Sequence, residues 1–554
     1  MQLFGRKPDS KVDTNKLMDR WLTRLKRSKY VRSKIEYKWN YWARIMDDDL
    51  WMDRTMTDNK VPVQVNELKS SIMSVLPSII LEPGVLEIRA YNMEDIELAA
   101  IYERIGENLD KSLGIYNEFM TMVYDAFLYG DGLCKLGYWH DIFIDRPLWN
   151  SGLTEPYGSR MSAFARHTPL IEIYPDYAAK RWDSQRYLIH ESIAHIDDVK
   201  SNTNYKKRIV NKITPGFSLR DMQINLMNSD DSRWMYEDSD YCLLYEIHDF
   251  VDRKIYIIVN GIDEDFLYEG PELYNISPFE NLWFFPRPKS IWHDSISQAI
   301  ERHIKDLSEA YTYMGDAISR EGITKILFKL AEIDPEQLKK LQSPTNEFVG
   351  INADDVGAFA QSLELGTSRQ QYIFETAIAQ YVERIRSISG VTAQERGFHE
   401  RGVETKYEAS MLQAASEIRS QLRSEMFSQF CSRVFTKLLY IVSLEYPAMK
   451  LAKMAGLSDF YSYVLQSGMP FDSSRFQVRY GQTAANSRHD RMQKLMLFNQ
   501  IAGPYFNPAI KMKLAADILD FEYTTEMMVL GDVANASQQG GQQMTDQIVQ
   551  GRMV

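Results

Sequence analysis

The sequence predicts an α+β fold, in which a domain of mixed helices and strands is followed by long amphipathic helices. Three observations predict it. Residues 406–446 contain neither Gly nor Pro, residues 294–320 carry a single apolar stripe, and residues 254–259 are rich in residues that favour strands. A chain of 554 residues is too long for one hydrophobic core, so several folding units are expected.

The composition is that of an ordered globular protein, with 44% hydrophobic and 25% charged residues. Cys134, Cys242 and Cys431 are odd in number and far apart, which argues against a disulfide framework and against a cysteine zinc cluster. The N-terminal residues lack the apolar core of a signal peptide, and no stretch approaches the ~18 uninterrupted apolar residues of a membrane span. We therefore expect a soluble protein of a reducing compartment.

Charge is divided unevenly along the chain. Residues 1–46 hold thirteen Lys and Arg against four acids, a net +9, and the whole chain carries −12, which leaves −21 on residues 47–554. Residues 15–46 also have helical periodicity, with Trp21 and Trp39 at apolar positions. Two interpretations stay open. This segment is either an arm on nucleic acid, with aromatics stacked on bases, or a basic helix docked on the acidic body of its own chain or a neighbour.

Residues 47–293 are expected to form an α+β domain. The predicted helices cover 66–76, ending at Pro77, and 95–129. The turn Gly130-Asp131-Gly132 then leads into a strand at 133–139. The further predicted strands cover 170–174, 186–191, 241–250 and 254–259, and the last two form a hairpin.

Two helices with apolar stripes bracket a small insert. Residues 294–320 place apolar side chains three or four residues apart, and 369–389 carry a stripe made of Ile373, Ala377, Tyr381, Ile385 and Ile388. Between them, 322–365 predict a β-α-β excursion, with strands at 323–330 and 347–351 around a short helix from 334. A small insert cannot bury both stripes, so we expect neighbouring copies of the chain to cover them.

The rest of the chain is predicted to be mostly helical. Residues 390–404 form a Gly-rich charged loop. Residues 405–446 start with a capping box and continue as one helix, whose second half is strongly apolar and therefore expected to be buried. Shorter helices follow over 447–530, and the Gln-rich end at 531–554 is expected to be disordered.

Motifs for catalysis are not found in the sequence. It contains no G-x-x-x-x-G-K-[ST] phosphate loop, no G-x-S-x-G elbow, no H-E-x-x-H pair and no G-x-G-x-x-G turn. The nine histidines lack metal-ligand spacing, and acidic groups such as Asp263-Glu264-Asp265 lie in polar, turn-rich stretches typical of solvated loops. We therefore expect a protein without enzymatic activity, cofactor or metal.

The order of these elements resembles that of portal proteins, the head-to-tail connectors of tailed bacteriophages. The resemblance spans most of the chain and is clearest from Ser290 to Tyr446; the helix ending in Phe127-Leu128-Tyr129 and the strand after it are also similar to part of portal wing domains. The segments that the resemblance implies are a basic N-terminal arm (1–46), the wing (47–293), a first stem helix (294–321), the clip (322–365), a second stem helix (366–389), the tunnel loop (390–404), a helix connecting wing and crown (405–446), the crown (447–530) and a flexible tail (531–554).

The resemblance implies a ring, usually of twelve copies, at one vertex of the capsid. Such a ring is part of the virion, is assembled in the host cytoplasm, and is the conduit for double-stranded DNA during genome packaging and ejection. The implied partners are other copies of the chain, the DNA, the terminase large subunit, a head-completion or adaptor protein and the major capsid protein, with no membrane.

Polar and charged residues of two segments are the candidates for contact with DNA or a partner. In the loop they are Gln394, Arg396 and Arg401, and in the insert they are Lys325, Lys329, Lys339 and Lys340. Lys and Arg neutralise phosphates, but each of these cations is equally placed to pair with a nearby acid such as Glu395, Glu400 or Glu336.

Two other classes of function stay open. A nucleic-acid or membrane-surface scaffold anchored by the basic N-terminal arm would lose its function without the arm, while its body would stay monomeric. A packaging nuclease or ATPase would show turnover that depends on a metal or a nucleotide.

Overall fold

The computed structural model describes ten stretches of the chain, and the structural statements below refer to these. They are residues 10–48, 63–80, 84–138, 163–213, 241–322, 325–328, 360–363, 368–390, 406–456 and 471–481. The chain divides into two compact units, residues 1–80 with 86–480 and residues 81–85 with 481–554. Apart from Gly84, Val85 and Gly481, every described residue belongs to the first unit.

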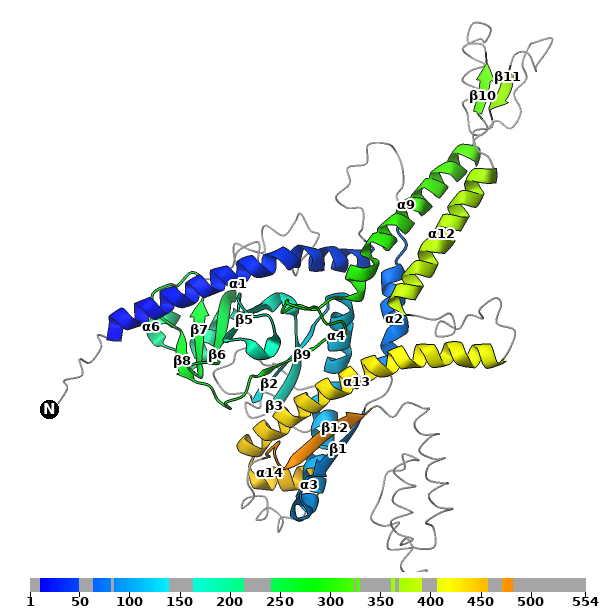
Figure 1. Cartoon of the computed structure of the whole chain (residues 1–554). Helices are drawn as coiled ribbons and strands as arrows, with labels where there is room; N and C mark the ends of the chain where they lie inside the picture. Colours follow the sequence, from blue (N-terminus) through cyan, green and yellow to red (C-terminus); the bar gives the residue numbers. More distant parts are fainter. Residues whose placement is uncertain are drawn as a thin grey trace, which may run out of the picture. The chain divides into compact units, whose positions relative to one another are not determined.

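A five-stranded antiparallel sheet has helices packed on both faces, and α1 (Ser10–Met46) lies along it in Figure 1. In spatial order its strands are β4 (Ile173–Pro175), β5 (Tyr187–His195), β6 (Tyr241–Asp249), β7 (Lys254–Val259) and β8 (Tyr268–Pro271). Along β6, Leu243 and Tyr245 pack with α1, whereas Cys242 and Leu244 pack with the short helices α5 (Ile196–Ser201) and α6 (Lys207–Val210). Because side chains alternate between the two faces, burial of both explains the nearly continuous apolar run of this strand.

A three-stranded antiparallel sheet belongs to the main core. Its middle strand, β2 (Gly132–Tyr138), lies between β3 (Ala163–Thr168) and β9 (Phe279–Leu282). β2 contacts α4 (Ile115–Leu128) and α13 (Lys406–Glu445), and Phe119 of α4 packs edge to face against three side chains of α13, Phe427, Phe430 and Phe435. The prediction that the second half of this long helix is buried is confirmed.

A strand pair brings together residues that are far apart in the sequence. β1 (Val85–Ala90) pairs with β12 (Phe476–Gly481), and α3 (Ile96–Leu113) contacts α14 (Ala448–Met454). Tyr102 of α3 packs edge to face against Phe471 and Phe476. Residues 447–480, the start of the segment predicted to be the crown, therefore belong to the same compact unit as residues 86–138.

α9 (Ile296–Gly322) and α12 (Ser368–Ser389) lie side by side as a helical hairpin (Figure 1). The chain between them contains the antiparallel pair of β10 (Lys325–Phe328) and β11 (Ala360–Leu363). The bounds predicted for the two helices, 294–320 and 369–389, agree with the structure to within two residues.

Several predicted boundaries are wrong, each for a local reason. The helix predicted at 95–129 is two helices, because Gly114 adopts φ 62° and forms a left-handed cap after α3. α2 (Glu67–Ile79) continues through Pro77, because a proline in the last turn removes only one hydrogen bond. The predicted strand at 170–174 begins as the 3-10 turn η2 (Leu170–Glu172).

In the insert, the strand that pairs with β10 lies at 360–363. The strand predicted at 347–351 and the helix predicted from 334 lie outside the described residues.

Candidate functional site

Asp131 connects the turn after α4 to the start of the helical hairpin. Its fully buried carboxylate accepts hydrogen bonds from the backbone N–H of His293 (2.9 Å), from His293 Nδ1 (2.6 Å) and from Asn281 Nδ2 (2.7 Å). Gly130 has φ 103°, and a Cβ at this position would collide with the carbonyl group of His293. The predicted turn is therefore also the contact that sets where α9 begins.

The first half of α9 is anchored in the core of its own chain. Four residues of its apolar stripe have at most 2% of their surface exposed: Ile296, Ile300, Ile304 and Leu307. Glu301 Oε2 also accepts a hydrogen bond of 2.9 Å from Trp42 Nε1 of α1. The expectation that this stripe needs neighbouring copies is wrong for these residues, because α2, α4 and α12 pack against α9.

The second helix of the hairpin is covered less completely. Along its predicted stripe, burial falls from Ile385, which is fully buried, through the half-buried Tyr381 and Ala377. Among the hairpin residues whose side chains the structure describes, four large apolar ones are exposed: Ile388 by 43%, Tyr313 by 54%, Ile373 by 55% and Tyr372 by 69%. The hairpin is therefore buried at its base, around Ile296 and Ile385, and leaves apolar side chains exposed farther along its helices.

The residues predicted to contact DNA or a partner lie mostly outside the described residues. Lys325 is the first residue of β10 and lies opposite Leu363 of β11. The other candidates of the insert (Lys329, Lys339 and Lys340) and those of the loop (Gln394, Arg396 and Arg401) lie outside the described residues.

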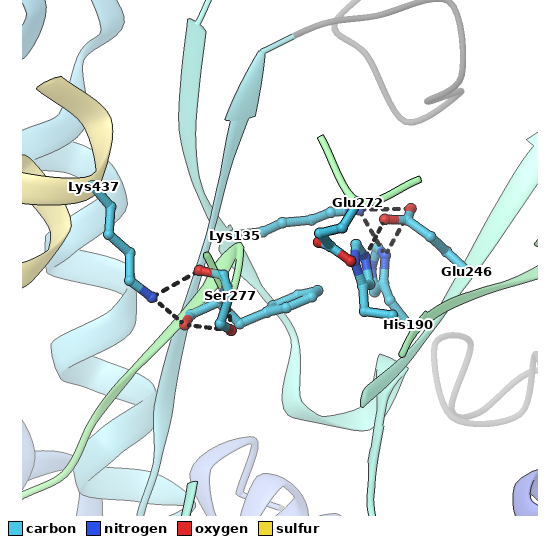
Figure 2. Close-up of polar contacts among 8 residues, drawn as sticks. Lys135, His190, Glu246, Glu272, Ser277 and Lys437 are labelled. Carbon is cyan, nitrogen blue, oxygen red and sulfur yellow. Dashed lines mark hydrogen bonds and ion pairs between the residues drawn. The ribbon is translucent and has the colours of Figure 1, made fainter. Parts of the chain in front are cut away.

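A buried ion network joins the two larger sheets (Figure 2). Lys135 of β2 places Nζ 2.9 Å from Glu246 Oε2 of β6 and 3.1 Å from His190 Nδ1 of β5. His248 lies between two carboxylates, with Nε2 2.6 Å from Glu246 and Nδ1 3.2 Å from Glu272. Because each side chain of this network is at least nine-tenths buried, the network acts as a structural link between the sheets.

The network keeps Glu246 ionised and His248 protonated. Burial opposes ionisation of Glu246, but the charge of Lys135 and the hydrogen bond from His248 hold the pKa of Glu246 well below its usual range. Burial also opposes protonation of His248, but Glu272 and Glu246 outweigh it and raise the pKa of His248 to about 9. Sequence reasoning missed this cluster, because Lys135 is 55 residues from His190 and 111 from Glu246.

α1 docks on the body of its own chain. Trp21 packs in the core on one face of the five-stranded sheet, and Trp39 and Trp42 pack in the main core. The Nζ of Lys29 lies 3.3 Å from the carboxylate of Glu191 on β5. The docked-helix interpretation is confirmed, and the stacking interpretation is wrong for these three indoles, because burial keeps them from contact with bases.

A cleft of about 770 Å³ lies beside α13 and β9. Lys437 of α13 borders it and donates hydrogen bonds to the carbonyl oxygens of Ser277 (2.7 Å) and Phe279 (3.2 Å), as Figure 2 shows. Lys437 and Arg433 also lie 2.8 and 3.0 Å from Glu280. The cations that α13 contributes to the cleft therefore hold β9 in place.

The described residues contain no group of three or more His, Cys, Asp or Glu placed to hold a metal ion. The three cysteines are free, and burial raises the pKa of each thiol, to about 11 for Cys242, so they stay protonated at neutral pH. In the acidic group expected to be solvated, Glu264 lies 3.6 Å from Arg208 and Asp265 lies 2.9 Å from Lys206. Glu264 and Asp265 therefore form ion pairs with residues of the same chain.

Comparison with known proteins gives no family for this chain: no protein-family model matches it, and no curated protein does. Among the described helices, none is both long enough and apolar enough to cross a lipid bilayer.

Proposed function

We propose that this chain is the portal protein of a tailed bacteriophage, with copies that form a ring around a channel for double-stranded DNA. The order of elements supports the proposal: an α+β region, a helical hairpin with a two-stranded sheet between its helices, and then the long helix α13. The hairpin is the observation that carries it. Its base is fixed in the core, whereas Tyr372 and Ile373 of α12 are left exposed.

The exposed side chains of the hairpin favour contact between copies. Full burial of one large apolar side chain contributes roughly 1.5–3 kcal/mol. A contact between two different faces of neighbouring copies closes into a ring when the rotation between copies is right, so the hairpin of the next copy is the proposed cover for α12.

The proposed ring is a conduit for DNA, and the chain carries out no catalytic step in it. Residues 47–554 carry a net charge of −21, and a surface with this sign disfavours tight binding of phosphates, so that DNA can move through the ring. The ring would lie at one capsid vertex, after assembly in the host cytoplasm. It would dock the terminase large subunit, a head-completion or adaptor protein and the major capsid protein.

Native mass spectrometry and end-on particle images test the ring. The full chain should form closed rings, of twelve copies if the resemblance holds. The double variant Tyr372→Lys, Ile373→Lys should shift the population to monomers that keep the helical circular dichroism of the unaltered chain, because both side chains are more than half exposed within one copy.

The matched control is Met93→Lys in the 3-10 turn η1 (Met93–Asp95), where the side chain is 90% exposed. This variant should keep the ring. Monomers of the unaltered chain at every concentration, or rings that tolerate the two lysines on α12, would contradict the proposal.

A further inference from the structure

One face of α1 is left uncovered and carries positive charge. Five of its cations lie within about a third of the helix circumference and together form the cationic face: Lys16, Arg20, Lys26, Lys34 and Lys38. Arg27 lies in the same arc but contacts Tyr177 of the body. Lys16 and Lys34 are 18 residues apart, as are Arg20 and Lys38, which places each pair five turns apart on the same side of the helix. All of them are exposed except Lys38, which is half-buried.

Cations on the docking side of the same helix have partners in the chain. Arg24 lies over the ring of Trp21 at 4.4 Å, and Lys29 forms its ion pair with Glu191. The members of the cationic face form no ion pair with another described residue. Between Lys16 and Lys38, only Asp19 adds an acid to that face.

A solvated helix face that needs only to be soluble normally mixes both signs, often as Glu and Lys pairs four residues apart. The cationic face instead holds five cations against one acid, on a chain whose remaining residues are strongly acidic. This separation of charge indicates a polyanionic partner.

We propose that the cationic face of α1 binds the phosphate backbone of double-stranded DNA without reading its sequence. The face runs from Lys16 to Lys38, which spans about 33 Å at 1.5 Å per residue. A duplex presents about one negative charge for each 1.7 Å of its axis, so about 20 phosphates lie along an equal length of duplex, more than the five cations need. Tyr30 and Tyr37, exposed by 66% and 62%, add hydroxyl groups that donate hydrogen bonds to phosphate oxygens.

The packing of α1 disfavours two other partners. A helix that lies in a membrane interface needs an exposed apolar face, but that face of α1 is buried in its own chain. A single strand is held by a run of stacking platforms, but the indoles of Trp21, Trp39 and Trp42 are buried, and the exposed rings of Tyr30 and Tyr37 stand about two helical turns apart. The site uses no residue of the helical hairpin, so it does not depend on the proposed ring.

Fluorescence anisotropy of the full chain with a labelled duplex of about 30 base pairs, measured across a series of salt concentrations, tests the site. The test variant combines Lys16→Glu, Lys26→Glu and Lys34→Glu. Because three phosphate contacts are lost, affinity should fall by about tenfold or more, and the slope of log affinity against log salt should become shallower by about 3.

The control variant combines Lys200→Glu, Lys207→Glu and Lys453→Glu, three exposed lysines on α5, α6 and α14. It makes the same change in net charge and should bind DNA nearly as well as the unaltered chain. Circular dichroism checks that each variant is folded, and the same three positions changed to Gln replace the test variant if the glutamates prevent folding. The neutral variant should then make the slope shallower by about 3 as well.

Four results would overturn the inference. They are no DNA binding by the unaltered chain, equal losses in the test and control variants, a test variant that loses only self-association, and a preference of the unaltered chain for vesicles of anionic lipid over DNA. Native mass spectrometry of the same samples keeps the proposals apart. A chain that binds DNA through α1 but forms no ring would contradict the portal function alone.

Discussion

At the scale of single residues, burial decides how much a charge contributes. Lys135 and Lys254 each hold a glutamate at about the same distance, 2.9 Å to Glu246 and 3.0 Å to Glu269. The first pair is almost fully buried, whereas the side chains of the second pair are 45% and 32% exposed. Water screens the exposed pair, and an uncompensated charge in the buried pair has no solvent to stabilise it.

We expect Lys135→Met to lower the free energy of unfolding by about 3–5 kcal/mol, because it leaves the Glu246 carboxylate buried without its main countercharge. Lys254→Met should cost less than about 1 kcal/mol. Urea denaturation of the two variants measures the difference. Similar losses of unfolding free energy at the two positions would show that burial does not decide how much each ion pair contributes to stability.

His248 predicts a loss of stability at alkaline pH. Its pKa is raised to about 9 in the folded chain, whereas an unfolded histidine titrates near 6.5. The protonated form therefore stabilises the fold fully below pH 6.5, and this contribution is lost as the pH rises through about 9. The difference in unfolding free energy between the unaltered chain and His248→Gln should shrink over this range. A difference that stays constant from pH 6.5 to 9 would show that His248 is not charged in the fold.

At the scale of elements, backbone conformation sets where helices stop and where strands start. Gly130 ends the turn after α4 with φ 103°, against the carbonyl group of His293, whereas Gly315 lies within α9 with open space around its Cα. A side chain is strained at the first position and favoured at the second, because alanine is the better helix former.

Gly130→Ala should therefore destabilise the chain by roughly 1–3 kcal/mol or more, from the strained backbone and the collision with His293. Gly315→Ala should stabilise it by about 0.5–1 kcal/mol. Thermal unfolding followed by circular dichroism gives both signs. A Gly130→Ala variant as stable as the unaltered chain would contradict the positive φ of this residue and its contact with His293.

At the scale of the whole molecule, α1 packs against two separate hydrophobic cores and so links them. Its N-terminal half, with Trp21, packs on the five-stranded sheet, and its C-terminal half, with Trp39 and Trp42, packs in the main core. The helix of the segment predicted to be a basic N-terminal arm is therefore part of the folded unit. Part of its positive charge, the cationic face, lies on the side that does not dock.

Trp21→Ala should lower the free energy of unfolding by about 3–5 kcal/mol, because it leaves a cavity where a fully buried indole stood. Tyr37→Ala, on the uncovered side of the same helix, should change it by less than about 0.5 kcal/mol. Chemical denaturation compares the two. A small effect of Trp21→Ala would mean that α1 is not docked.

The sequence by itself determined the elements whose signal is local. The bounds of α9 and α12, the β6–β7 hairpin and the apolar second half of α13 follow from helical or strand periodicity over neighbouring residues. The candidate DNA contacts of the insert and the loop rest on composition alone, and apart from Lys325 they lie outside the described residues.

Only the tertiary structure decided which surfaces are covered. The stripe of α9 is buried partly by elements from elsewhere in the chain, and Glu301 meets Trp42 from 259 residues away. The network around Lys135 and the division of α1 into a docked face and a cationic face arise in the same way. Periodicity shows that a face is apolar or charged, but what covers that face depends on contacts between distant residues, which no local pattern records.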